Sequence, residues 1–135
     1  MISNDEALAI LDKLSNLFGV QSPGLALDCE EIEHDKQILA GLIIEEDVIC
    51  LRQDKMEDWL VAHEFGHYLY HIYHGKNGHR ELDCENWARF FEAMWKDNQF
   101  GFYCEICNST GPVIMLIDGD LMCLQCESIY TLVFN

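Results

Sequence analysis

Two histidines and a glutamate stand close together in the run His63-Glu64-Phe65-Gly66-His67. The surrounding sequence predicts a helix, on which residues four apart lie about 40° apart around the axis. His63 and His67 therefore project from one face and can bind one metal ion. Glu64 lies one step round, where its carboxylate can take a proton from a zinc-activated water. This pattern is typical of zinc-dependent hydrolysis.

The residues around this motif are apolar on nearly every side of the predicted helix, which covers about residues 55–74. Such a helix is expected to be buried. Buried histidines and carboxylates without partners cost several kcal/mol, and a metal ion would supply one partner. The alternative is a pair of histidines that only pack or face solvent.

A catalytic zinc normally takes three protein ligands. The nearby candidates for the third are His71, His74, His79, Glu81 and Glu85. A second helix is predicted from about residue 79 to residue 97, and its apolar stripe comprises Cys84, Trp87, Ala88, Phe91, Met94 and Trp95.

Helical phase favours Glu81 as the third ligand, because it falls about 60° from Cys84 on the inward side of the stripe. A carboxylate in an apolar seam is rare unless a positive group lies there. Glu85 falls at the edge of the stripe, where it can hydrogen-bond a ligating histidine without binding the metal. An acidic helix N-terminus exposed to solvent would also explain Glu81.

A second metal site is predicted near the C-terminus. Two Cys-x-x-Cys pairs, Cys104/Cys107 and Cys123/Cys126, are separated by 15 residues, which is typical of a zinc ribbon. Four thiolates make a closed, structural zinc site. We expect a hairpin between the pairs, with its turn at Asp118-Gly119. The other three of the seven cysteines stand singly and are expected to be small buried apolar residues.

The remaining elements complete an α+β fold. A helix is expected from a cap at Asn4 to Gly19, followed by a hairpin of residues 38–44 and 48–51. Residues 25–35 remain ambiguous. We place a first domain at residues 1–99, with helices on a short antiparallel sheet, and a four-cysteine zinc ribbon at residues 100–135.

Charge limits the classes of partner. The chain of 135 residues has 24 acidic and 8 basic side chains, and its net charge is −16. Nucleic acids and anionic membranes bind clustered Lys and Arg, so we expect neither as a direct partner. No apolar run is long enough to span a membrane, and the N-terminus does not resemble a secretory signal. A cytoplasmic protein is therefore expected.

The run from Val61 to His71 resembles the active helix of the ImmA/IrrE metallopeptidases, whose typical sequence is A-H-E-L-G-H-Y-L-L-H. Their second motif, E-x-x-A-x-x-F-A, is similar to residues 81–88, with Cys84 for Ala and Trp87 for Phe. The resemblance covers about residues 1–98. The chain lacks the family's L-L-M-P-like continuation after Trp95, and the ribbon is not part of the usual domain.

This resemblance implies a small zincin-like, gluzincin-type domain with zinc on His63, His67 and Glu81 and with Glu64 as the base. It also implies a protein or peptide substrate, such as a helix-turn-helix repressor or another regulatory partner. Together with the ribbon, it predicts two zinc ions per chain, one catalytic and one structural.

Two alternatives remain open. SprT-type proteases join an H-E-x-x-H domain to a zinc ribbon and use a third histidine, which here would be His79 or a neighbour. They act on DNA-bound proteins, for which a chain of net charge −16 is poorly suited. The other alternative is a catalytically silent zinc module that regulates a partner. The presence of Glu64 argues against it, because a silent site does not need a base.

Overall fold

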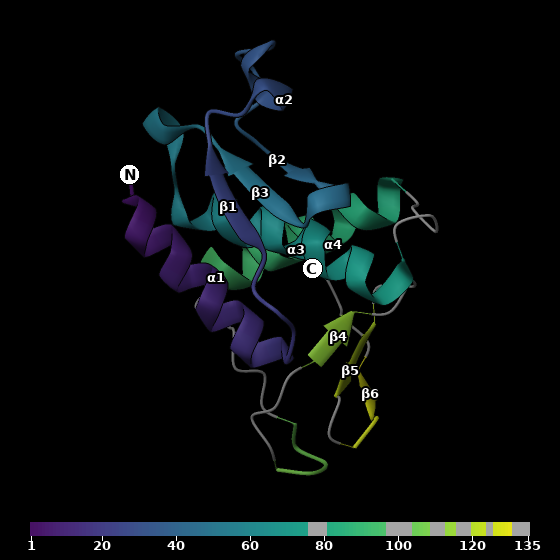
Figure 1. Cartoon of the computed structure of the whole chain (residues 1–135). Coiled ribbons are helices and arrows are strands. Elements are labelled where there is room, and N and C mark those ends of the chain that lie inside the picture. Colours follow the sequence, from purple (N-terminus) through teal and green to yellow (C-terminus); the bar gives the residue numbers. More distant parts are fainter. Residues whose placement is uncertain (76–80, 97–103, 109–112, 116–119, 124–125, 131–135) are drawn as a thin grey trace.

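The computed structural model describes residues 1–75, 81–96, 104–108, 113–115, 120–123 and 126–130. These residues form an α+β structure with the helices α1 (Asn4–Phe18), α2 (Glu30–Glu33), α3 (Asp58–His74) and α4 (Glu81–Lys96) (Figure 1). The first sheet has the order β1-β3-β2 and comprises β1 (Gly24–Leu27), β2 (Ala40–Ile43) and β3 (Val48–Leu51). The second comprises β4 (Val113–Met115), β5 (Leu121–Cys123) and β6 (Ile129–Tyr130).

Helix α1 follows the predicted pattern closely. Its N-cap is Ser3, one residue before the predicted Asn4, and a capping box joins Ser3 and Glu6. Gly19 ends the helix in the left-handed conformation, with φ 67°, which a glycine adopts without strain. The buried face consists of Ala7, Leu11, Leu14, Ser15 and Phe18.

The first sheet is mixed, so the expected antiparallel sheet is wrong in one respect. The predicted hairpin is confirmed, because β2 pairs with β3 in the antiparallel sense, with Gly41 opposite Cys50. Strand β1 lies within the segment that the sequence left ambiguous, and it pairs with β3 in the parallel sense. The central strand is therefore β3, and β2 is an edge strand.

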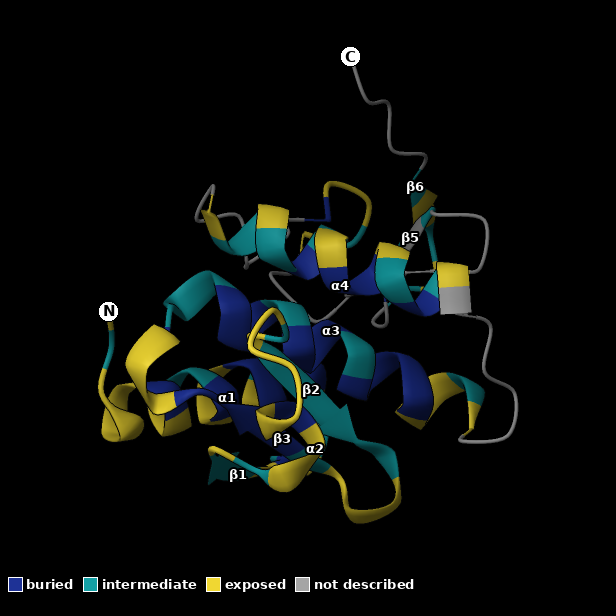
Figure 2. Cartoon of the chain, turned by 90° about the horizontal axis from the view of Figure 1, so that it is seen from above, coloured by how far each residue is buried: buried dark blue, intermediate teal, exposed yellow. Residues whose placement is uncertain are grey.

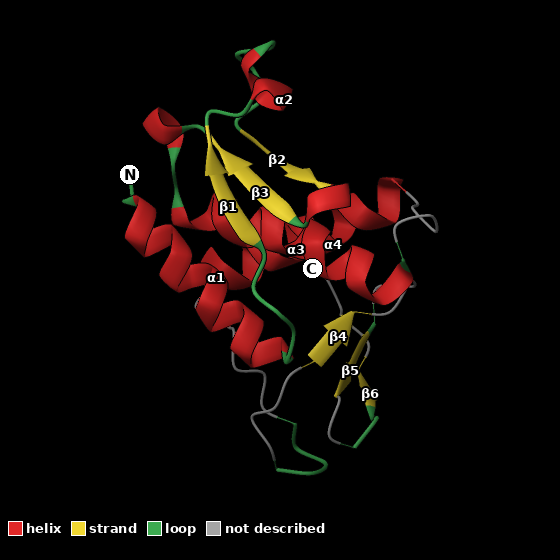
Figure 3. Ribbon diagram, in the orientation of Figure 1, coloured by secondary structure: helices red, strands yellow, loops and turns green. Residues whose placement is uncertain are grey.

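The two faces of β3 are covered differently. Ile49 and Leu51 are fully buried and join the core formed with α1, α3 and α4. Figure 3 shows these helices gathered on one side of the first sheet. Cys50 is also fully buried but lies outside that core, and it forms a disulfide with Cys29 at the start of α2. The expectation of single thiols is therefore wrong for this pair.

Helices α3 and α4 cross closely, and Gly66 lies at the crossing. A Cβ atom on Gly66 would lie 2.7 Å from the Ala88 Cα and 2.8 Å from the Trp87 carbonyl oxygen. Helix α3 lies between α4 and the first sheet, and most of its residues are buried (Figure 2). This close packing brings the polar residues of α4 to the histidines of α3.

The C-terminal sheet contains the predicted hairpin strands and one strand that was not predicted. Strand β4 pairs with β5, with Val113 opposite Cys123, and β5 also pairs with β6. The predicted turn at Asp118-Gly119 and the predicted domain boundary near residues 99–101 lie outside the described residues. None of the helices in the described ranges is long and apolar enough to span a membrane.

Candidate metal centre

His63 and His67 lie on one face of α3, as the spacing predicts. Their ring centroids are 5.1 Å apart, and their side chains are 17% and 19% exposed. The rest of the helix is largely buried from Leu60 to His71, which explains the apolar residues around the motif. The two rings are therefore held by a rigid element but remain open to a ligand.

Glu85 on α4 faces both histidines. One of its carboxylate oxygens lies 3.7 Å from His63 Nε2, and the other lies 3.4 Å from His67 Nε2. One ligand atom from each of the three residues lies within 4.8 Å of the others, as a shared metal ion requires. The sequence predicted Glu85 as an outer hydrogen-bonding residue, whereas its carboxylate lies where it could bind a metal ion together with both histidines.

The other ring nitrogen of each histidine also has a partner on α4. His63 Nδ1 lies 3.2 Å from a Glu92 carboxylate oxygen, and His67 Nδ1 lies 2.9 Å from the Cys84 sulfur. Histidines that bind a metal through Nε2 commonly donate the Nδ1 proton to such a partner. Both Nε2 atoms are therefore directed toward Glu85 and away from these outer contacts.

The other predicted candidates lie elsewhere or are not described. Glu81 is the first residue of α4, but its side chain lies outside the described part of the chain, so its assignment as third ligand stays a prediction. His79 also lies outside that part. His71 Nε2 is 3.8 Å from the Cys84 sulfur, and His74 Nδ1 is 3.0 Å from the Tyr70 carbonyl oxygen.

Glu64 is buried beside this cluster and is only 5% exposed. Burial raises the pKa of its carboxyl to about 8, and the negative charge of Glu85 contributes in the same direction. Burial also raises the pKa of Cys84 to about 12, with smaller contributions from Glu64 and Glu85. A divalent cation beside Glu64 would oppose this shift, because it would favour the ionised carboxylate.

A cavity of about 250 Å³ opens beside the cluster. It is lined by Glu64, His67, His71, Cys84 and Glu85 of the two helices and by Ala40, Gly41, Leu42 and Ile44 of β2 and the turn after it. His67, the buried Glu64 carboxylate and the edge strand β2 therefore border one space.

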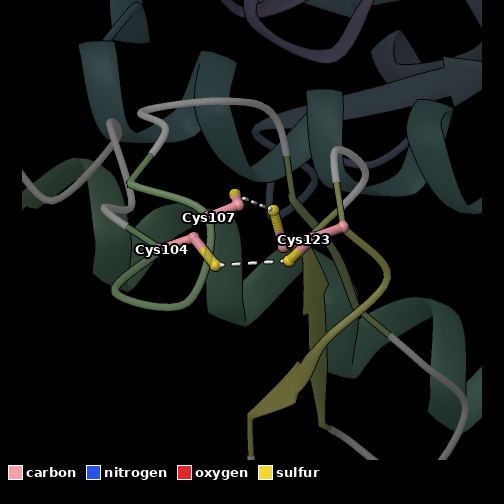
Figure 4. A group of neighbouring side chains, drawn as sticks. Cys104, Cys107 and Cys123 are labelled. Atoms are coloured by element: carbon pink, nitrogen blue, oxygen red, sulfur yellow. Dashed lines mark hydrogen bonds between the residues drawn. The ribbon is translucent and has the colours of Figure 1, made fainter.

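The four ribbon cysteines meet as predicted. The Cys104 and Cys126 sulfurs lie 3.6 Å apart, the Cys107 and Cys123 sulfurs lie 3.7 Å apart, and one atom from each of the four lies within 4.8 Å of the others. Figure 4 shows the sulfur atoms turned toward a common centre. This is the arrangement that a tetrahedral zinc site needs.

Both Cys-x-x-Cys turns share a backbone feature. The residues that follow them, Asn108 and Glu127, adopt left-handed φ values of 56° and 61°. The second turn is closed by backbone hydrogen bonds between Cys123 and residues 127 and 128. Hydrogen bonds lower the pKa of Cys104 to about 6, and the largest contribution comes from the Tyr130 hydroxyl; the lowered pKa favours the thiolate that binds metal.

No protein-family model, curated protein or solved structure matches this chain. The donor atoms themselves must therefore indicate the chemistry. Two imidazole nitrogens with one carboxylate fit catalytic zinc, and four thiolates fit structural zinc. Carboxylate and thiol partners on the Nδ1 atoms of His63 and His67 strengthen this fit.

Proposed function

We propose that the protein is a zinc-dependent metallopeptidase that hydrolyses peptide bonds in a protein or peptide substrate. The observation that carries the proposal is the convergence of His63 Nε2, His67 Nε2 and the Glu85 carboxylate beside the buried Glu64. An H-E-x-x-H helix with a carboxylate from a second helix is a ligand set of catalytic zinc sites. The ImmA/IrrE-like motifs of the sequence agree with this proposal.

His63, His67 and Glu85 would hold the zinc, with Glu81 as the alternative carboxylate. Zinc bound there would activate water and polarise the carbonyl of the scissile bond. Glu64 would accept a proton from the attacking water and donate it to the leaving amine. Its burial supports this role, because a raised carboxyl pKa near neutrality suits a group that both accepts and returns a proton.

The edge strand β2 supports a polypeptide as substrate. Its residues Ala40, Gly41 and Leu42 line the cavity that also contains Glu64 and His67. A strand at a sheet edge can pair with an extended peptide through backbone hydrogen bonds, largely independently of the peptide's sequence. A peptide bound in this way would lie alongside His67 and Glu64.

The second metal would have a structural role. The four ribbon cysteines form a closed site, and a segment of this length needs a metal to stabilise so small a core. Residues 100–135 contain no Lys or Arg, so we propose contact with protein and not with nucleic acid. The Cys29–Cys50 disulfide would be unusual in the reducing cytoplasm that the sequence predicts.

Incubation with a library of quenched fluorescent peptides tests the proposal. We expect zinc-loaded protein to cleave a subset of the library, and a chelator to abolish the cleavage. Re-addition of zinc should restore it. Cleavage that persists after the His63/His67 zinc has been removed would contradict the proposal.

A further inference from the structure

We propose that Cys84 is a positioning residue that fixes the ring of His67 by accepting its Nδ1 proton and that passes a hydrogen bond on to His71. This inference rests on the proposed metal site, for which His67 Nε2 must be free to bind zinc. It assigns a role to a cysteine that belongs neither to the ribbon nor to the disulfide.

The contacts of Cys84 carry the proposal. Its sulfur lies 2.9 Å from His67 Nδ1 and 3.8 Å from His71 Nε2. His67 and His71 are four residues apart on α3, so their side chains project from the same face of the helix. Cys84 is 2% exposed and His71 is 5% exposed, so solvent offers little competition for these contacts.

A thiol can donate its one proton and can also accept a hydrogen bond at sulfur, so it can serve both contacts at once. If Nε2 of His67 binds zinc, Nδ1 carries the ring proton and donates it to the sulfur. The thiol proton is then available to His71 Nε2. The two hydrogen bonds, from His67 to Cys84 and from Cys84 to His71, together fix the tautomer of both histidines.

The two zinc-binding histidines are therefore held by different partners. The Nδ1 atom of His63 faces the Glu92 carboxylate, whereas that of His67 faces a thiol, which is a weaker acceptor. Loss of a residue that hydrogen-bonds a metal-binding histidine typically lowers the metal affinity about 10–100-fold. For a thiol we expect a loss near the lower end, about tenfold.

A pair of substitutions separates hydrogen bonding from packing. Cys84→Ser keeps a donor and an acceptor, whereas Cys84→Val keeps the apolar bulk and removes both. Zinc affinity of the histidine site is measured by competition with a graded series of chelators, and the ribbon zinc is the internal control. The tautomer of His67 is measured by ¹⁵N NMR in zinc-free and zinc-loaded protein.

We expect the serine variant to retain most of the affinity and the valine variant to lose about tenfold, with mixed His67 tautomers. Unchanged affinity in the valine variant would overturn the proposal. If both variants lose zinc affinity, the proposal is supported only when the His67 tautomer changes in both variants. A loss of affinity in both without that change would overturn it. Wild-type protein that binds no zinc at His63 and His67 would instead refute the proposed function, while the tautomer in zinc-free protein still tests Cys84.

Discussion

Gly66 and Ala88 face one another where α3 and α4 cross, at a distance that leaves no room for a side chain on Gly66. A Cβ atom there would lie 2.7 Å from the Ala88 Cα and 3.0 Å from its backbone nitrogen. Both are backbone atoms, so a side-chain rotation cannot relieve the contact. This crossing brings Cys84, Glu85 and Glu92 to the two histidines, because all three are on α4.

Gly66→Ala should therefore push the two helices apart. We expect a loss of about 1–3 kcal/mol in the free energy of unfolding, measured by urea denaturation. Zinc affinity at the histidine site should also fall, because Glu85 moves with α4. Gly41→Ala is the control, since its new Cβ would meet only an Ile32 side-chain carbon at 3.4 Å. Equal stability of the two variants would refute this packing argument.

The choice between Glu85 and Glu81 as third ligand can be made by counting zinc. Glu85→Ala should reduce the zinc content from two ions per chain to one, because it removes the carboxylate that faces both Nε2 atoms. Glu81→Ala should leave two ions. Native mass spectrometry gives the stoichiometry directly. Loss of one zinc ion in Glu81→Ala would instead support Glu81 as the third ligand, as the helical phase predicted. Loss of one zinc ion in His79→Ala would favour the SprT-like alternative.

The local spacing of apolar and turn residues in the sequence was sufficient to predict most helices and the β2–β3 hairpin. The helical spacing of Leu11, Leu14 and Phe18 and the left-handed Gly19 define α1 without tertiary information. Strand β1 could not be predicted in this way. It has four residues, and its parallel partner β3 is 24 residues away, so its stability depends on pairing that no local signal reports.

The candidate site was predicted in part. The positions of His63, Glu64 and His67 follow from helix geometry alone. The roles of Glu85 and Cys84 depend on how α4 lies across α3, which the close contact at Gly66 determines. The Cys29–Cys50 bond likewise joins residues 21 apart, and neither position carries a pairing signal in the sequence.

In zinc-free protein, Glu64 should make stability depend on pH. The ordinary pKa of a glutamate carboxyl is 4.5, and burial and Glu85 raise that of Glu64 to about 8 in the folded chain. The folded state therefore binds more protons between these values, so stability falls as pH rises from about 4.5 to 8. Glu64→Gln does not titrate. Its stability advantage over wild type should grow across this range, and a constant difference in urea midpoint would contradict the prediction.

Tyr130 should influence the acid sensitivity of the ribbon. Its hydroxyl lies 3.1 Å from the Cys104 sulfur and is the largest cause of the lowered pKa of that thiol. In Tyr130→Phe the thiol pKa should rise, so protons compete with zinc at a higher pH. We expect ribbon zinc to be released at a higher pH than in wild type, as followed with a colorimetric zinc indicator. An unchanged release profile would show that the hydroxyl does not support the thiolate.

The central claim is that Glu64 acts as the base of a zinc peptidase, and the hydrolysis rate of Glu64→Gln tests it most directly. Glutamine has nearly the same shape but cannot accept the proton of the attacking water. The variant should therefore keep its fold and both zinc ions while its cleavage rate on a peptide selected with wild type falls about 10²–10⁴-fold. Unchanged cleavage by a variant that retains both ions would contradict the account.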